Sequence, residues 1–402
     1  MRILPATFCA PILVTVLAAC SVASADTAQS AQDSGAPLPV AGRSTVYAPH
    51  GIIATSQPLA SAAGLRVLEA GGNAFDAAIA ASAVLSLVEP HMTGLGGDLF
   101  ALFWSADEDR LVGLDATGRA GSRSTPEQIR SDGFDRMPGS GPQAVTVPGA
   151  IAGWAALNEK YGSMPLDQIL ERAIDLAENG FPVSPIIADQ WQGQLGKLQS
   201  DPGATTTYLV DGERAPTAGE WFTNPDLGRS LRMVAEEGAD AMYGGALGRQ
   251  VVDGLEELGG YLTTEDMEGM EVRWVDPISA DYKGWTVWEL PPAGQGVAAL
   301  QMLELVEPFD LRRMGHNSPE YLHTLIEAKK LAFADLARYV ADADHMEVTT
   351  DELLDPDYLS ERRGMIDAGR AAERVEPGEL VTHSETIYLS VADQYGNQVS
   401  FI

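Results

Sequence analysis

The sequence predicts an α+β fold, in which helices pack against a sheet built from hairpins. Residues 74–88 are apolar or small nearly all round, which is typical of a buried helix, and the run is too short to span a bilayer. Residues 99–104 and 111–116 predict two paired strands joined by an acidic turn. Residues 386–402 predict a β-hairpin, because apolar and less apolar positions alternate on either side of Gly396-Asn397.

The composition indicates a large globular protein with an acidic surface. The chain has 402 residues, of which 45% are hydrophobic, enough for one large domain or two ordinary ones. Its 57 acidic and 26 basic residues give a formal net charge of -31, which repels nucleic acid and anionic membrane surfaces. We therefore expect no nucleic-acid partner, and membrane contact only through a lipid anchor.

The N-terminus predicts export. Residues 1–25 carry an early Arg2, then a mostly apolar run without acidic residues, as in a secretory signal. One interpretation places ordinary cleavage after Ala25. The favoured one is a lipobox that ends before Cys20, which would then be lipidated. Residues 26–43 are rich in Ser, Ala, Gly, Pro and Gln and predict a disordered linker. The expected location is the periplasm or the outer membrane of a bacterium.

The remaining elements follow from periodicity and from Gly and Pro punctuation. Further strands are expected at 51–55, 274–278 and 285–290, the last two on the main sheet. Further helices are expected from Pro58 to Ala70 and at 150–161, 166–178, 186–199, 227–237, 245–258, 297–306 and 318–339.

Three motif blocks occur in order at residues 54–60, 71–78 and 89–98, and two more at 147–153 and 291–296. Together with the segment that starts at Thr386, they resemble the γ-glutamyltranspeptidase family over about residues 46–402. This resemblance implies a four-layer αββα N-terminal nucleophile (Ntn) hydrolase fold, with a large subunit at 44–385 and the start of a small subunit at 386–402. On the same basis the chain is expected to be incomplete at its C-terminus, with its final strand an unpaired edge of the sheet.

The resemblance also implies the chemistry. The precursor would cut itself between Glu385 and Thr386, and the freed α-amino group, with an ordinary pKa of about 7.7 to 8.0, would activate the Thr386 hydroxyl. Thr386 would then form a γ-glutamyl ester from a compound such as glutathione and pass the acyl group to water or an amino acid. The expected product of cleavage is a heterodimer of large and small subunits. Neither a metal nor a cofactor is expected, because the six histidines and two cysteines show no ligand spacing.

One departure leaves the substrate open. Where the family carries the arginine that binds the glutamyl carboxylate, this chain has Thr117, and Arg119 follows two residues later. Arg119 either binds the carboxylate from a shifted backbone or is a surface arginine. An acylase acting on a non-glutamyl amide is therefore the alternative within the fold. The alternative of another class is a catalytically incomplete, acidic surface lipoprotein that acts in binding.

Overall fold

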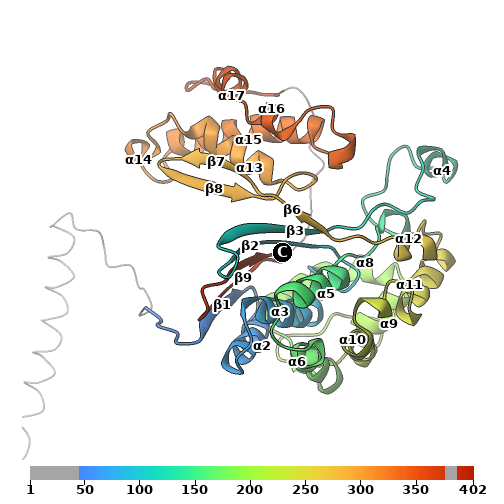
Figure 1. Ribbon diagram of the computed structural model, residues 1–402. Helices are drawn as coiled ribbons and strands as arrows, with labels where there is room; N and C mark the ends of the chain where they lie inside the picture. The colour runs from blue at the N-terminus through green and yellow to red at the C-terminus, as the bar shows by residue number, and fades with distance from the viewer. Residues whose placement is uncertain (1–44, 376–386) are drawn as a thin grey trace, which may run out of the picture. The chain divides into compact units, whose positions relative to one another are not determined.

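The computed structural model describes residues 45–375 and 387–402, of which Pro49–Ile402 belong to one compact unit. Its centre is a six-stranded sheet of order β1-β9-β10-β2-β3-β6, in which all neighbours are antiparallel (Figure 1). The strands are β1 (Gly51–Thr55), β2 (Leu99–Ser105), β3 (Arg110–Ala116), β6 (Arg273–Val275), β9 (Leu389–Asp393) and β10 (Gln398–Phe401).

The hairpin predicted for the C-terminal segment is confirmed over its described part, with β9 and β10 paired around the turn at Gly396. Its position differs from expectation. β9 pairs with β1, where Leu389 lies opposite Thr55, and β10 pairs with β2, where Phe401 lies opposite Ala101. The expected unpaired edge at β10 was therefore wrong, because β2 supplies the partner that removes it.

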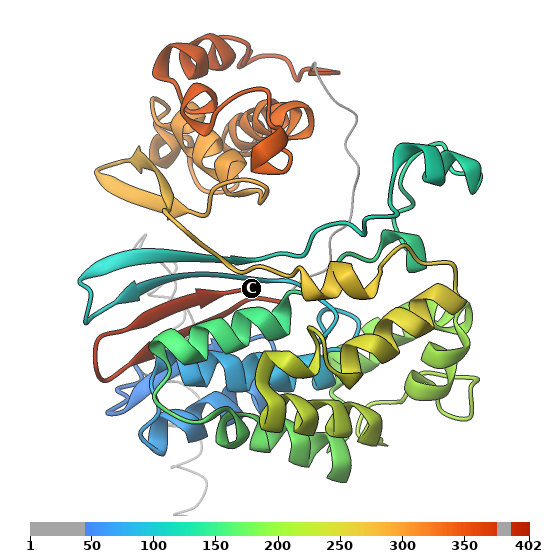
Figure 2. The ribbon, with the colours of Figure 1, turned by 45° about the vertical axis from the view of Figure 1, so that its right-hand side comes forward.

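A layer of helices covers one face of this sheet (Figures 1 and 2). Its main members are α2 (Pro58–Glu69), α3 (Ala74–Val88), α5 (Ala150–Tyr161), α6 (Leu166–Asn179) and α10 (Pro225–Glu237). Every residue of α3 is buried, which confirms the predicted buried helix. Its many alanines let it lie close to β9, β10 and the helices beside it.

Smaller elements surround this layer. They are α4 (Pro126–Ser131), α7 (Pro185–Gly193), α8 (Leu195–Gln199), α9 (Pro202–Tyr208), α11 (Ala246–Glu257) and α12 (Thr264–Glu268), with the short strands β4 (Phe181–Pro182) and β5 (Trp221–Phe222). The single helix expected over 186–199 is divided at Gln194 into α7 and α8, directly after Gly193, a residue that favours a helix end.

A second core cluster forms around α13 (Gly296–Val306), α15 (Pro319–Tyr339) and α17 (Pro356–Arg363), with the short helices α14 (Leu311–Met314) and α16 (Thr350–Leu353) nearby. β7 (Ile278–Tyr282) and β8 (Trp285–Glu289) pair with each other as a separate two-stranded sheet. The expectation that the strand at 285–290 joins the main sheet was wrong. Pro277 follows β6 and lacks a backbone donor, so the sheet pairing stops there and the chain leaves as a new hairpin.

Some features predicted for the ends of the large subunit lie outside the described residues. They are the signal at 1–25 with Cys20, the linker at 26–43, and the residues Glu385 and Thr386. Within 45–375 and 387–402, no helix combines the length and the apolar character that crossing a membrane would require.

Candidate functional site

At one end of the main sheet, where several strands begin or terminate, the sequence motifs come together. β1 ends there at Thr55, which lies opposite Leu389, the first residue of β9. β2 begins there at Leu99, which lies opposite Ala116, the last residue of β3. Because the motif blocks at 54–60 and 89–98 adjoin these strand ends, both reach the same edge. We call this end of the sheet, together with the loops that leave it, the motif edge; the name refers to the ends of the strands and not to an outer strand.

The segment that follows the predicted nucleophile enters the sheet at the motif edge. Ile387 is buried among the core residues, and Tyr388 is 54% exposed. Leu389 and Val391 are buried like Ile387. The two faces predicted from alternation are thus confirmed from residue 387 onward, with the apolar face turned toward the helices.

The opposite face of the sheet, away from the helix layer, carries polar groups near the motif edge. Residues paired across antiparallel strands share a face, as do residues two apart on one strand. One such row runs across five strands through Ser390, Ser400, Leu102, Gly113 and Val275. Two positions closer to the motif edge, Asp115 and Arg273 lie opposite each other on the same face.

Asp115, Arg273 and Thr117 form a connected cluster. Arg273 Nη2 donates to Asp115 Oδ2 at 2.6 Å. The other carboxylate oxygen, Oδ1, accepts from the backbone N of Thr117 at 2.9 Å and from its hydroxyl at 2.6 Å. The Asp115 side chain is 6% exposed and that of Arg273 is 38% exposed, so a buried carboxylate holds a cation that still reaches solvent.

The loops at the motif edge are tied to one another through backbone groups. Gly97 O accepts from the amides of Gly149 and Ala150, both at 2.9 Å, which attaches the 147–153 block to the 89–98 block. Asp98 Oδ1 accepts from Gly118 N at 3.0 Å. Gly118 is required at its position, because a Cβ there would lie 1.5 Å from the carbonyl oxygen of Val147.

Two further residues brace these loops. Tyr243 donates its hydroxyl to Pro148 O at 2.6 Å and accepts from Ala152 N at 3.1 Å, and burial raises the pKa of this tyrosine. Ser56 donates to Glu89 Oε2 at 2.8 Å, which joins the end of β1 to the residue that ends α3. The loops are therefore held by pairs that come from distant parts of the chain.

Arg119, the predicted carboxylate-binding residue, lies at the motif edge but is loosely held. Its side chain is 70% exposed, and its nearest acidic partner is Asp344 at 3.8 Å, in an exposed ion pair. Only its backbone is anchored, through a hydrogen bond from Val147 N to Arg119 O of 3.0 Å. Its role in substrate binding stays a prediction.

Arg273 and Tyr243 were missed by the sequence argument. Arg273 is 158 positions from its partner Asp115, and Tyr243 is 95 positions from Pro148. No local periodicity or motif spacing connects residues so far apart. Only the pairing of β3 with β6 and the packing next to α5 bring them to the motif edge.

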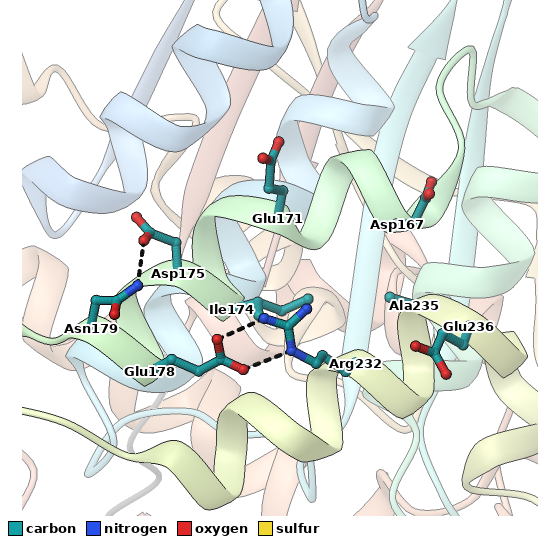
Figure 3. A pocket seen from close by; sticks show the side chains of 9 residues that line it. All are labelled: Asp167, Glu171, Ile174, Asp175, Glu178, Asn179, Arg232, Ala235 and Glu236. Atoms are coloured by element: carbon teal, nitrogen blue, oxygen red, sulfur yellow. Dashed lines mark hydrogen bonds and ion pairs between the residues drawn. The ribbon is translucent and has the colours of Figure 1, made fainter.

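Away from the motif edge, the described chain also has a hollow on its surface. A surface hollow of about 400 Å³ lies between α6 and α10, lined mainly by acidic side chains (Figure 3). In it Glu178 and Arg232 form two parallel hydrogen bonds of 2.7 and 2.6 Å, and none of the motif blocks contributes to it. Across 45–375 and 387–402, no three His, Cys, Asp or Glu residues are grouped so that they could hold a metal ion.

Comparison with known proteins accounts for the motif blocks. Residues 60–402 match the model of a family described as gamma-glutamyltranspeptidase. The glutathione hydrolase-like YwrD proenzyme of Bacillus subtilis (strain 168) is 38% identical over 348 residues, which are 86% of this chain and 64% of the relative. The acylase ACY 1 proenzyme of Pseudomonas sp. (strain SE83) is 35% identical over 360 residues, 87% of this chain and 64% of the relative. The chain thus spans just under two thirds of the length of these curated relatives.

The fold is shared with solved structures. The crystal structure of cephalosporin acylase from Bacillus halodurans matches with a TM-score of 0.83 and 40% identity, covering 92% of this chain and 68% of that one. The predicted α+β class is therefore confirmed.

Proposed function

We propose that this chain, which belongs to the gamma-glutamyltranspeptidase family and has an Ntn hydrolase fold, is part of an amide-cleaving enzyme whose nucleophile is Thr386. Cleavage of the Glu385–Thr386 bond would generate this nucleophile. The named relatives are proenzymes, which supports a precursor that must be cut before it acts.

The observation that carries the proposal is the path of the chain directly after Thr386. Ile387 is buried, and Leu389 begins β9 opposite Thr55 at the motif edge. Consecutive Cα atoms are about 3.8 Å apart, so a new N-terminus at Thr386 would be one residue from a well-packed position. A nucleophile attached to a central strand is held more firmly than one on a free loop.

Activation of the nucleophile needs only groups that Thr386 itself would supply after cleavage. Its α-amino group accepts the hydroxyl proton while the hydroxyl oxygen attacks the amide carbonyl carbon of the substrate. The same proton passes to the leaving amine as the C–N bond breaks, which leaves an ester on Thr386. Water, or the amine of an amino acid, then attacks the ester carbonyl carbon and gives a proton to the α-amino group. The proton passes to Thr386 Oγ as the ester C–O bond breaks, which restores the hydroxyl and releases the acid or the new amide.

Cleavage would leave two chains that share one sheet. β9 and β10 would belong to the new small subunit, whereas their partners β1 and β2 would belong to the large one. Backbone hydrogen bonds on both sides of the hairpin would keep the two together. We therefore propose a heterodimer of large and small subunits.

For the substrate we propose a γ-glutamyl compound such as glutathione, with a non-glutamyl acyl amide as the second candidate. The glutathione hydrolase-like relative supports the first. Thr117, together with relatives that are named acylases, favours the second. Rates of hydrolysis of γ-glutamyl, glutaryl and plain acyl anilides would separate them.

The test of self-cleavage is the intact mass and N-terminal sequence of the protein purified from its own host. We expect a fragment that begins at Thr386, and we expect a Thr386→Ala variant to remain uncut. An uncut wild-type chain would refute the proposal and favour the binding lipoprotein.

We further propose that the protein is exported, as a periplasmic protein or as a lipoprotein anchored at Cys20. Metabolic labelling with a radioactive fatty acid should mark the wild-type protein but not a Cys20→Ala variant. Labelling of both would exclude Cys20 as the lipidated residue.

A further inference from the structure

We infer that residues 367–372 form a strap that α15 holds by its backbone, and that this strap keeps the end of the large subunit docked whether or not the chain is cut. The docking of a cut chain rests on the proposed function, whereas the strap itself does not. Its anchors on α15 are His323, Glu327 and Lys330, which lie outside every motif block of the sequence.

Glu327 is a charged residue on the buried side of α15. Its side chain is only 4% exposed, and a carboxylate is rarely buried so far unless it is paired. Lys330 Nζ lies 2.6 Å from one of its oxygens, Oε1. The other oxygen, Oε2, accepts from the backbone N of Ala372 at 3.2 Å. A lysine of the same helix and a backbone amide of the strap therefore compensate the buried charge.

Lys330 and His323 complete the set of anchors. Lys330 Nζ donates to Ala372 O at 2.6 Å, so both backbone groups of Ala372 are held by α15. Near the other end of the strap, His323 Nε2 donates to Asp367 O at 2.8 Å. Positions 323, 327 and 330 recur at helical spacing, so the three side chains share one face of α15.

The chain is also fixed on both sides of the strap. Ile366 before it and Val375 after it pack against the second core cluster. Within the strap, Gly369 N donates to Asp367 Oδ1 at 2.8 Å and Arg370 N donates to Asp367 O at 3.3 Å, which closes a turn. The strap is therefore a shaped segment with apolar contacts at either end.

The proposed cut would leave all of these contacts within the large subunit. Each of them joins residues between 319 and 375, and the bond after Glu385 follows later in the sequence. The end of the large subunit would therefore stay docked on α15 after cleavage. A docked chain end also exposes less backbone to proteases, which need a locally open segment.

Arg370 makes the state of the strap measurable. Its side chain is 77% exposed, so a protease can reach the charge that it recognises. Its peptide bond to Ala371, however, lies next to Ala372, whose backbone is held by Glu327 and Lys330. Cleavage there requires the strap to open, so its rate follows the population of the open form.

The experiment follows digestion of the full chain by an arginine-specific protease, with mass spectrometry of the fragments. The parent protein carries Thr386→Ala, so self-cleavage cannot influence the result. The reference bond is that after Arg136, an exposed arginine in the loop that follows α4. The rate of cutting after Arg370 is compared with the rate after Arg136 in the same sample.

The test variant is Glu327→Met/Lys330→Met, which removes both anchors of Ala372 together. Losing Lys330 alone would leave a buried carboxylate without its cation, whereas apolar residues of similar volume often replace a buried ion pair without loss of stability. Lys329→Met is the matched control, because this neighbouring lysine lies over the ring of Phe333, 4.9 Å from its centroid. Circular dichroism verifies the fold of each protein.

We expect the parent protein to be cut after Arg370 at least about tenfold more slowly than after Arg136. Loss of both anchors should raise the rate after Arg370 by roughly tenfold or more, since a hydrogen bond to a charged group is worth about that factor. The rate after Arg136 should not change. Lys329→Met should alter neither rate.

Equal cutting at the two arginines in the parent protein, or an unchanged rate after Arg370 in the double variant, would overturn the inference. The wild type then tests docking after cleavage. A protein that is cut before Thr386 and keeps Arg370 protected supports it, and loss of that protection on cutting refutes it. A wild type that is never cut but keeps Arg370 protected would retain the strap and refute the proposed self-cleavage.

Discussion

The carboxylate of Asp393, the last residue of β9, accepts a hydrogen bond of 2.9 Å from the backbone N of Ala74, the first residue of α3. The first amides of a helix have no partner within the helix, and Asp393 satisfies one of them. Its other oxygen accepts from the amides of Tyr395 and Asn397, both at 2.9 Å. One side chain therefore closes the C-terminal turn and ties it to the buried helix.

We expect Asp393→Ala to lower the free energy of unfolding by about 2 kcal/mol, because it removes several hydrogen bonds to one charged group. Urea denaturation followed by circular dichroism measures the change. Asp107→Asn is the control, since Asp107 is an exposed acidic residue and its loss should cost under about 0.5 kcal/mol. Equal effects of the two substitutions would show that the tie to α3 contributes nothing.

Asp76 should be important for folding. It is fully buried and accepts from Asn73 N at 3.0 Å, from Ser163 N at 3.1 Å and from the Ser163 hydroxyl at 2.6 Å. Asp76→Ala leaves these donors unpaired and should destabilise the protein by about 3 kcal/mol. Ser163→Ala, which removes one hydroxyl alone, should cost about 1 kcal/mol. Thermal and urea unfolding measure both variants. The prediction is contradicted if Ser163→Ala lowers the free energy of unfolding as much as Asp76→Ala does.

Trp154 of α5 offers a comparison within one site. Its side chain is fully buried, and its indole N–H has no hydrogen-bond partner in the described part of the chain. Trp154→Ala should cost about 3 to 5 kcal/mol, because it opens a large cavity. Trp154→Phe should cost much less, since it keeps most of the apolar volume and removes the unpaired N–H. Calorimetric unfolding measures the stability of both variants. If Trp154→Phe is as unstable as Trp154→Ala, the explanation is wrong.

Glu220 should make the stability of the folded protein depend on pH in the acidic range. Two hydrogen bonds from Arg214, at 2.8 and 2.9 Å, and then those from Thr217 lower the pKa of Glu220 from its ordinary 4.5 to about 2. A lowered pKa means that the folded state holds the charged form more strongly than the unfolded state does. This contribution is complete above pH 4.5 and is lost as the pH falls toward 2.

The measurement is the difference in Tm between the wild type and Glu220→Gln across this range. We expect the wild type to be the more stable at pH 6, and the difference to shrink between pH 4.5 and pH 2. Glu213→Gln, which leaves the Arg214–Glu220 pair intact, serves as the control. A difference that stays constant down to pH 2 would show that the pair does not shift the titration.

Local patterns were sufficient for the elements that have a strong period or composition. The buried helix α3 could be predicted because its residues are small or apolar all round, and the β9–β10 hairpin because alternation and a Gly-Asn turn occur within one short segment. The motif blocks likewise predicted a family that the comparisons then showed. Prediction failed where partners are distant, as with the edge strand and the placement of β8.

By itself, then, the sequence determined the α+β class, the main helices and strands, and the family. It also singled out Thr386 as the residue to test. Only the tertiary structure decided that β9 and β10 lie between β1 and β2, and that Arg273 is held by Asp115 at the motif edge. The physical reason is that hydrophobic periodicity, and the burial that it predicts, depend on residues that are close together in the sequence. Strand order and ion pairing depend on which free edges and charges meet once the whole chain has packed.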